Sequence, residues 1–570
     1  MLNHLYTKQG KNLSDVPHYT YPRPNLKRKS FFCLNGQWDF CAIKKGEVAE
    51  YNEKIIVPFV PESLLSGINR TFKNGTIFCY KKEFSLPRGF KRTRVILHFG
   101  AVNQKAEVYL NGILLGEHKG GYMPFSYDIT ENLSKNNILE VRAKNDFDDF
   151  NLPYGKQCRK RGGMWYTACS GIWQTVWCES VPENYIKNIK ITADTESALF
   201  EIDGADSGEI IITTKEGRVA LPFKYGRARY TPENPVNWSP ENPYLYYCTV
   251  IAGEDKVETY FALRSVEIKE INGVMRTCLN GKPYFFHGLL DQGYFSDGIF
   301  TPASLEVYEQ DIKTAKELGF NMLRKHIKIE PPQFYYDCDR LGMVVFQDMV
   351  NNGKYSFFRD TALPTVCFKK LPQFAMNRTR AQKQEFYNAL KETVEHLNNY
   401  PSICCYTIFN EGWGQFDEDD MYLRIKLMKT GRLIDTASGW FKTEHNDFES
   451  LHIYFKKIKI KPQTKPIYLS EFGGYSFKPT GHIFNTKGTF GYKFFKNRKQ
   501  FENALLKLYE KEVIPTIKTG LCATVYTQLT DVEDETNGLI SYDREVVKVD
   551  KRRMMSMANK IFKEFNKVTK

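Results

Sequence analysis

Short apolar runs alternate with segments of helical spacing through the C-terminal half of the chain, from about residue 271 onward. Ser304, a candidate N-cap, opens a segment that stops at Gly319 and carries apolar residues at helical spacing: Leu305, Tyr308, Ile312, Ala315 and Leu318. Residues 332–341 and 382–397 have the same character, and each is followed by an apolar run of β type. This alternation predicts βα units and a parallel sheet.

Eight apolar runs in this part are predicted as strands: 282–290, 320–326, 343–348, 403–410, 434–440, 449–454, 467–471 and 521–528. Eight strands that alternate with helices predict a (β/α)8 TIM barrel over residues 271–570. Two long loops, 351–380 and 476–497, are expected to overhang the mouth of this barrel, where long loops are commonly functional.

Two β-rich units are predicted before the barrel. Residues 1–181 contain short strands separated by turns, and Asn111-Gly112 is a strong hairpin signal, so an N-terminal jelly-roll sandwich is expected. Residues 182–270 are again rich in strands, and their length suits an immunoglobulin-like β-sandwich. A chain of 570 residues is too long for one core, in keeping with this multidomain reading.

The composition narrows the function. Hydrophobic residues make up 42% of the chain and charged residues 26%, which is ordinary for a soluble globular protein. The net charge of +14 comes from scattered lysines, which favours a solvated surface over nucleic-acid binding. Neither a membrane span nor a signal peptide is expected, because no long apolar run is present. The 13 cysteines, without a Cys-x-x-Cys pair, fit a reduced, cytoplasmic protein.

Two of the predicted strands end in a glutamate. Glu411 directly follows the run 403–410, and Glu471 ends the run 467–471, each soon followed by glycine. The carboxyl ends of barrel strands face one cavity, so strands four and seven would place these carboxylates on opposite sides of it. Two carboxyl groups about 5 Å apart, one protonated and one ionised, cleave a glycosidic bond with retention of configuration. The sequence therefore predicts a two-carboxylate active site.

Motifs along nearly the whole chain resemble glycoside hydrolase family 2, the β-galactosidase, β-glucuronidase and β-mannosidase group. Those in the first sandwich are similar to the family's sugar-binding domain: Leu34–Phe40, Phe99–Val102, Val108–Gly112 and Gly171–Val176. The others are similar to the family's central sandwich and barrel and occur in the same order: Trp238–Tyr246, Phe261–Arg264, Leu279–Pro283, Asn321–His326 and Asn410-Glu411.

This resemblance implies roles for individual residues. Glu411 would be the general acid/base, and Glu471 would be the nucleophile. Asn410 would hydrogen-bond the sugar 2-hydroxyl, and His326 looks like the family's sugar-contacting histidine. Tyr454 could orient Glu471. Such a carboxylate pair needs no cofactor, and no metal site is expected.

Further candidates for contact with the substrate lie near the mouth. Trp413 and Tyr526 are candidate stacking platforms, with core packing as an equal alternative. Polar residues at the ends of strands one and three could read hydroxyl groups: Asp291, Gln292, Tyr294 and Asp348. For Asp348, a structural pairing with Arg324 is the alternative.

The identity of the sugar depends on loops. The β-glucuronidases of the family hold the uronate carboxylate with an Asn-x-Lys pair, whereas the similar stretch here, 533–538, has no lysine in that place. Its acids would repel a carboxylate if they face the site: Asp531, Glu533, Asp534 and Glu535. We therefore expect a retaining, exo-acting β-glycosidase, with β-galactosides as the favoured substrates. The alternatives are a β-glucuronidase or other β-glycosidase of the same family, and a catalytically silent carbohydrate-binding protein; a homo-oligomer stays open.

Overall fold

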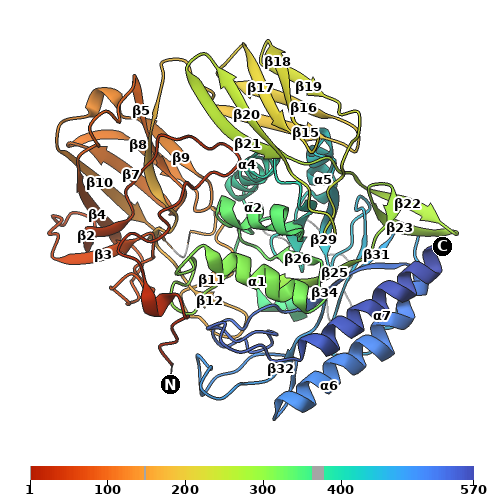
Figure 1. Ribbon diagram of the computed structural model, residues 1–570. Coiled ribbons are helices and arrows are strands. Elements are labelled where there is room, and N and C mark those ends of the chain that lie inside the picture. Colours follow the sequence, from red (N-terminus) through yellow and green to blue (C-terminus); the bar gives the residue numbers. More distant parts are fainter. Residues whose placement is uncertain (1, 147–148, 363–377) are drawn as a thin grey trace.

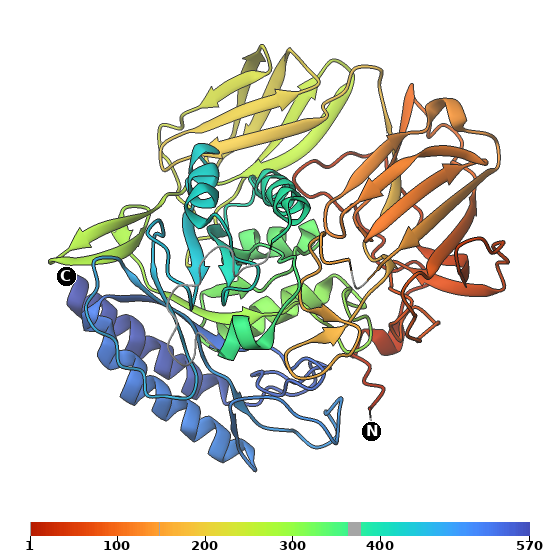
Figure 2. The same ribbon diagram turned by 180° about the vertical axis from the view of Figure 1, so that it is seen from behind.

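The computed structural model describes residues 2–146, 149–362 and 378–570. Two β-sandwiches lie side by side against one flank of a larger barrel, which ends in two long helices (Figures 1 and 2). The N-terminal segment also reaches the barrel, where the Thr7 hydroxyl donates to the Asp297 carboxylate at 2.6 Å. None of the described helices is long and apolar enough to cross a membrane. Domain boundaries at residues 181 and 270 stay predictions.

The first sandwich is the predicted jelly roll. Its six-stranded sheet has the order β3-β2-β4-β10-β7-β8, and its four-stranded sheet has the order β1-β14-β5-β9. The predicted Asn111-Gly112 hairpin joins β7 to β8, and both residues have positive φ, of 53° and 81°. The strand bounds are β1 Phe32–Cys33, β2 Gly36–Ile43, β3 Glu53–Val57, β4 Ile77–Phe84, β5 Arg94–Phe99, β7 Lys105–Leu110, β8 Ile113–Lys119, β9 Phe125–Asp128, β10 Asn137–Lys144 and β14 Val176–Val181.

The second sandwich is the predicted immunoglobulin-like unit. Its seven strands run β15-β16-β19-β18-β17-β20-β21, and only one residue pair, Lys224 with Arg227, joins β18 to β19, so the sheet folds over there. The two layers face each other across Phe200 and Phe261, whose ring centroids are 5.3 Å apart. The bounds are β15 Asn188–Ala193, β16 Ala198–Asp203, β17 Ser207–Thr213, β18 Arg218–Lys224, β19 Arg227–Tyr230, β20 Tyr246–Ala252 and β21 Asp255–Phe261.

The C-terminal part is the predicted TIM barrel. All eight predicted strands form one sheet of parallel pairs in the order β29-β28-β27-β26-β25-β34-β31-β30. Every residue is buried in seven of these strands, the exception being β30, and this burial explains why the seven are apolar runs rather than alternating ones. The bounds are β25 Phe286–Asp291, β26 Met322–Lys325, β27 Val344–Asp348, β28 Ile403–Asn410, β29 Leu433–Ser438, β30 Glu449–Ile453, β31 Ile467–Gly473 and β34 Leu521–Thr527.

Helices cover the outside of the barrel. Before α1, Leu305 takes the N-cap place, while the Ser304 hydroxyl accepts the Glu306 N–H at 3.3 Å. The helices are α1 Glu306–Glu317, α2 Pro332–Leu341, α4 Arg380–His396, α5 Glu418–Leu427, α6 Arg498–Leu508 and α7 Lys551–Thr569. Short strands lie outside the barrel: β6 Val102–Asn103, β11 Gln157–Cys158, β12 Tyr166–Thr167, β13 Gly171–Ile172, β22 Val266–Ile271, β23 Val274–Leu279, β24 Lys282–Pro283, β32 Tyr475–Ser476 and β33 Lys493–Phe494.

The two long loops have different outcomes. In the loop 351–380, residues 363–377 lie outside the described residues, so its predicted position over the mouth cannot be followed there. The loop 476–497 packs against the segment that follows β34, where the Phe490 N–H donates to the Asp534 carbonyl at 2.7 Å. It also brings Tyr492 to the end of β30, where its ring stacks on Tyr454 with centroids 3.7 Å apart.

One seam of the barrel is held by side chains. β29 and β30 stand at the two ends of the hydrogen-bonded order, and the segment before β30 joins them. The Asp447 carboxylate accepts the Ile434 N–H at 2.8 Å, while the Asp447 N–H donates to the Ile434 carbonyl at 3.0 Å. The Ser450 hydroxyl donates to the Asp435 carboxylate at 2.9 Å. Side-chain acceptors therefore replace a β ladder at this seam.

Removing the Asp447 carboxylate should open this seam. Asp447→Ala leaves the Ile434 N–H without its acceptor and removes a 2.7 Å bond from the Tyr422 hydroxyl, so we expect a loss of about 1–3 kcal/mol in the free energy of unfolding. Urea denaturation measures it. Asp206→Ala, on the exposed surface of the second sandwich, is the control and should change stability by less than about 0.5 kcal/mol. Equal midpoints for the two variants would contradict a role for Asp447 in closure.

Candidate active site

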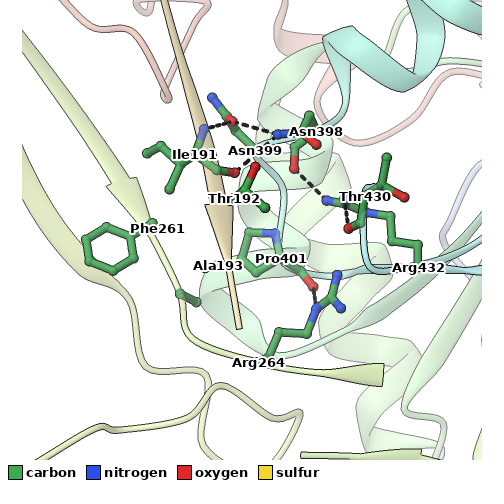
Figure 3. A pocket seen from close by; sticks show the side chains of 11 residues that line it. Ile191, Thr192, Ala193, Phe261, Arg264, Asn398, Asn399, Pro401, Thr430 and Arg432 are labelled. Carbon is green, nitrogen blue, oxygen red and sulfur yellow. Dashed lines mark hydrogen bonds between the residues drawn. The ribbon is translucent and has the colours of Figure 1, made fainter. Parts of the chain in front are cut away.

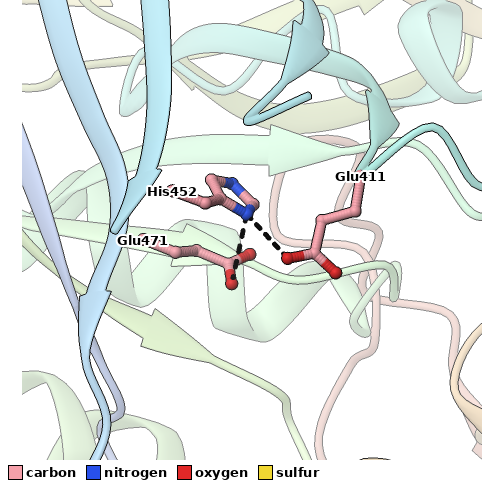
Figure 4. Close-up of side chains that lie close together, drawn as sticks. All are labelled: Glu411, His452 and Glu471. Atoms are coloured by element: carbon pink, nitrogen blue, oxygen red, sulfur yellow. Dashed lines mark hydrogen bonds and ion pairs between the residues drawn. The ribbon is translucent and has the colours of Figure 1, made fainter. Parts of the chain in front are cut away.

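Glu411 and Glu471 meet at the carboxyl ends of the barrel strands. Glu411 directly follows β28, and Glu471 lies within β31. His452, from β30, stands between them: its Nδ1 is 2.8 Å from Glu411 Oε1 and 3.7 Å from Glu471 Oε2 (Figure 4). The closest ligand atoms of all three side chains lie within 4.8 Å of one another. The structure therefore brings the two predicted carboxylates into one site.

The turn after β28 sets the direction of Glu411. Its φ is +53°, a left-handed conformation, and Gly412 follows with φ +71°. A Cβ on Gly412 would lie only 2.0 Å from the Phe441 ring, so glycine is required at this close approach. The glycine that follows the first glutamate in the sequence is explained by this contact.

Arg324, in β26, organises the floor of the site. Its side chain is fully buried and donates to four acceptors. Nε donates to Asp348 Oδ1 at 2.9 Å, and Nη2 donates to Asn410 Oδ1 at 2.9 Å. Nη1 donates to Glu471 Oε1 at 3.2 Å and to the Ser470 carbonyl at 3.1 Å. One guanidinium thus fixes residues from strands three, four and seven.

The surroundings of Glu471 favour its ionised form. Burial alone would raise the pKa of this carboxyl, but the charges of His452 and Arg324 outweigh burial and lower the pKa to about 2. Tyr454, from the end of β30, adds to this effect by donating its hydroxyl proton to Glu471 Oε2 at 2.5 Å. Glu471 is therefore a carboxylate at neutral pH, as a nucleophile must be.

Asp348 links Arg324 to the predicted sugar-contacting histidine. Its Oδ2 lies 2.7 Å from His326 Nδ1, and Arg324 holds its other oxygen. Burial opposes ionisation of Asp348, yet the Arg324 charge lowers the pKa of this carboxyl. Asp348 is thus a structural partner of Arg324 and orients the His326 ring, which leaves the other ring nitrogen for the cavity.

The remaining predicted residues lie in different places. Asn410 joins the site through Arg324. Trp413 is almost fully buried, and its indole N–H donates to the Gly353 carbonyl at 3.0 Å. Tyr526 is fully buried in the core, where its hydroxyl accepts the Tyr475 N–H at 3.1 Å.

The polar residues at the end of strand one interact with groups other than the two glutamates. Asp291 pairs with Lys325 at 2.5 Å, and Tyr294 packs among aromatic rings. Gln292 is buried, and its Oε1 has no hydrogen-bond partner among the described residues. None of these three forms a hydrogen bond or ion pair with Glu411 or Glu471 in the part of the chain that the structure describes.

The acids of the loop after β34 are mostly paired. Asp531 forms a buried ion pair with Lys548 at 2.6 Å. Arg161, from the jelly roll, lies 3.1 Å from Asp534 and 3.4 Å from Glu533. Lys548 and Arg161 therefore offset the negative charge of these three acids, and with it the expected repulsion of an anionic substrate.

Glu535 differs from its acidic neighbours because its partners are neutral. It accepts hydrogen bonds from the Tyr166 hydroxyl and, at 3.1 Å, from Asn537 Nδ2. Burial raises the pKa of Glu535, and the charge of Lys156 acts against this rise. Burial lowers the pKa of His326, and the same lysine lowers it further. Lys156 therefore lies close enough to both residues to influence the site.

Sequence reasoning missed three of these residues. His452 stands two positions before Tyr454, so its place at the end of a predicted strand is the sequence feature that could have identified it. Arg324 was considered only as a partner of Asp348, although it also holds Glu471 and Asn410. Lys156 belongs to the jelly roll, and nothing in the barrel sequence points to it.

The Glu411, His452 and Glu471 side chains also have the donor types that a divalent cation prefers, one imidazole nitrogen and two carboxylates. These donors fit a small metal ion. The same atoms already form a hydrogen bond and an ion pair with one another, so the three side chains have partners within the cluster. The expectation that no metal is needed stays a prediction.

Two sandwiches before a barrel, with paired glutamates at the ends of strands four and seven, define a multidomain glycoside hydrolase. Comparison with known families agrees: residues 59–163 match the glycosyl hydrolase 2 galactose-binding domain-like family, and residues 270–537 match the TIM barrel domain of glycosyl hydrolases family 2. The chain belongs to glycoside hydrolase family 2.

The individual proteins that this chain resembles carry the names of different glycosidases. A β-galactosidase of Thermoanaerobacter pseudethanolicus is 28% identical over 47% of this chain and 39% of its own length, so the chain spans about two fifths of that relative. A β-glucuronidase of Streptococcus agalactiae is 25% identical over 68% of this chain and 67% of its own. The solved β-D-glucuronidase of Dictyoglomus thermophilum has the same fold, with a TM-score of 0.75 at 18% identity over 95% of this chain and 98% of that one.

Tyr454→Phe should change the pH dependence of turnover. The variant removes a hydrogen bond that helps to lower the pKa of Glu471, so this pKa should rise from about 2 toward its ordinary value of 4.5. The loss of activity on the acid side should then begin at a higher pH, and kcat/KM should fall by roughly 10–100-fold, as expected for a hydrogen bond to a charged group. A pH profile of kcat/KM measures both changes.

Tyr51→Phe is the matched control, because Tyr51 makes a comparable 2.8 Å bond to Glu140 in the jelly roll, far from the barrel. It should leave the profile unchanged. An acid limb that does not move in Tyr454→Phe would refute the role of Tyr454 in keeping Glu471 ionised.

Proposed function

We propose that this protein is a retaining, exo-acting β-glycosidase. The observation that carries the proposal is the short separation of the two carboxylates, whose closest oxygens lie within 4.8 Å. Retaining glycosidases hold the two carboxyl groups about 5–5.5 Å apart, whereas inverting ones need about 6.5–9.5 Å to admit a water molecule between carboxylate and sugar. The short distance between the closest oxygens supports the retaining arrangement.

The contacts of the two glutamates assign their roles. Glu471, ionised beside Arg324, attacks the anomeric carbon and forms a glycosyl-enzyme bond as the glycosidic bond breaks. Glu411 gives its proton to the departing oxygen, then takes a proton from the water that releases the sugar. His452 engages Glu411 Oε1, so the other oxygen is directed to the glycosidic oxygen (Figure 4).

Asn410 adds a contact that strengthens during the reaction. Arg324 Nη2 occupies its Oδ1, so the amide group is oriented with Nδ2 as the donor for the substrate. Donation to the sugar 2-hydroxyl stabilises an oxocarbenium-like transition state by several kcal/mol in retaining enzymes of this kind.

Substitution of either glutamate should abolish turnover. Glu471→Gln and Glu411→Gln should each lower kcat/KM by about 10³-fold or more on nitrophenyl β-glycosides, because one removes the nucleophile and the other the acid. Added azide should restore turnover by Glu411→Ala, since a small anion needs no general base, and the product should keep the β configuration by NMR. The matched control is Glu418→Gln, a few residues beyond Glu411 in α5.

Three outcomes would reject these assignments. Near-normal turnover by either variant would remove the corresponding role, and an inverted product would remove the double-displacement mechanism. No hydrolysis of any glycoside by the unmodified protein would favour the catalytically silent carbohydrate-binding protein.

For the glycone, we propose a β-galactoside as the first candidate and a β-uronide as the second. The β-galactoside follows from the missing lysine in the stretch 533–538. The β-uronide is favoured by Lys156, which is only 7% exposed and whose side chain makes no hydrogen bond or ion pair with a described residue. Its Nζ lies 5.6 Å from the centroid of the Trp165 ring. A buried lysine without an anion is costly, and a substrate carboxylate would supply one.

Lys156→Met distinguishes the two candidates. If the glycone is a uronide, this variant should lower kcat/KM on nitrophenyl β-glucuronide or β-galacturonide by about 100-fold, the effect of losing a charged hydrogen bond, with little change on the β-galactoside. Lys160→Met is the control, because Lys160 is an exposed residue of the same loop. A uronide activity that is unchanged in Lys156→Met would eliminate Lys156 as the carboxylate partner.

A further inference from the structure

A polar cavity lies between the second sandwich and the barrel, at the end of β28 opposite to Glu411. Its volume is about 40 Å³, several times the roughly 10–15 Å³ that one water molecule requires. β15 of the sandwich forms one wall, and two loops of the barrel form the other (Figure 3). Its polar lining comes from both domains: Thr192, Arg264, Asn398, Asn399, Thr430 and Arg432.

Two arginines converge on this cavity, and both are more than nine-tenths buried, with 7% and 8% of their surface exposed. Arg264 donates from Nη2 to the Ile403 carbonyl at 2.6 Å, and Arg432 donates from Nε to the same carbonyl at 3.1 Å. Their other hydrogen bonds also end on main-chain carbonyls, including that of Pro401 at 2.8 Å from Arg264 Nε. One carbonyl thus holds two like charges close together.

Neither arginine forms an ion pair in the described part of the chain, where their hydrogen bonds all end on main-chain carbonyls. Burial lowers the pKa of Arg264, and the nearby Arg432 charge lowers it further. The acid whose charge acts on Arg264 is Asp339, and its oxygens already accept the Ser402 N–H and the Tyr260 hydroxyl, each at 2.8 Å. Buried charges in proteins are normally paired, so this pair of cations lacks its counter-charge.

We propose that the cavity binds a tetrahedral oxyanion, phosphate or sulfate, between Arg264 and Arg432. The planar guanidinium group donates two parallel hydrogen bonds to such an anion, which a lysine cannot do. Arg264 Nη1 takes part in none of the carbonyl contacts, so it faces the anion, and the Thr192 hydroxyl supplies a donor from the sandwich.

The bound oxyanion stabilises the seam between the two domains. Pro401 and Ile403, whose carbonyls the arginines hold, stand at the start of β28, while Thr192 belongs to β15. An anion that neutralises both guanidinium groups therefore joins the central sandwich to the strand that carries Glu411 at its far end. This site is separate from the glycosidase chemistry, so its test does not depend on turnover.

Calorimetric titration of the full-length protein with inorganic phosphate, and separately with sulfate, tests the proposal against sodium chloride at equal ionic strength. We expect one saturable site per chain for at least one of the two oxyanions. The midpoint of thermal unfolding should rise by roughly 2 °C or more at saturation, because a ligand that binds only the folded state stabilises it. A rise that is linear in salt concentration, or equal in chloride, would overturn the proposal.

Thr192→Glu supplies the missing charge from within the chain. It should raise the unfolding midpoint in the absence of oxyanion and abolish the calorimetric site, whereas Thr192→Gln, of equal size and without charge, should do neither. Arg264→Lys keeps the positive charge but loses the paired N–H donors of the planar guanidinium, so it should weaken oxyanion binding at least 10-fold. Unchanged phosphate and sulfate titrations in Thr192→Glu would place any bound anion elsewhere and refute the site.

Discussion

The buried guanidinium of Arg324 is the interaction on which the site depends. It lies inside the barrel with no exposed surface, where a single positive charge would be strongly unfavourable alone. Asp348 and Glu471 compensate it, and their charges outweigh burial and raise the pKa of Arg324. Removing Arg324 would leave the two buried carboxylates of Asp348 and Glu471 without the cation they share, which costs more than the loss of hydrogen bonds alone. Glu471, the proposed nucleophile, is thereby part of the structural core of the barrel.

This arrangement separates the environments of the two glutamates. Glu471 receives hydrogen bonds from Arg324 and Tyr454 and is held ionised, whereas the only side-chain hydrogen bond of Glu411 among the described residues is with His452. Double displacement needs this asymmetry, since the nucleophile must stay charged while the acid must gain and lose a proton. His452 Nδ1 lies 2.8 Å from Glu411 and 3.7 Å from Glu471, so one ring nitrogen is shared by the two carboxylates.

The fold could be predicted from the sequence because barrel strands buried on both faces are continuous apolar runs that alternate with helices. Glu411 and Glu471 could be predicted for the same reason, as the residues where such runs end. His452 could not, because its direction depends on an irregular register between β30 and β31, at Ser450–His452, which moves a side chain to the other face of the strand. Lys156 could not because it comes from another domain.

The acids near the barrel mouth show why the local charge cannot be predicted from the sequence of one loop alone. The acids after β34 suggested repulsion of an anionic sugar, yet Asp531 pairs with Lys548 from the same part of the chain, and Asp534 pairs with Arg161 from the jelly roll. The charge around the proposed site is the sum over all of these residues. Most of them are paired, whereas the buried side chain of Lys156 has no ion-pair partner among the described residues. Since Lys156 and Arg161 both come from the jelly roll, the proposed recognition of a uronide requires that domain as well as the barrel.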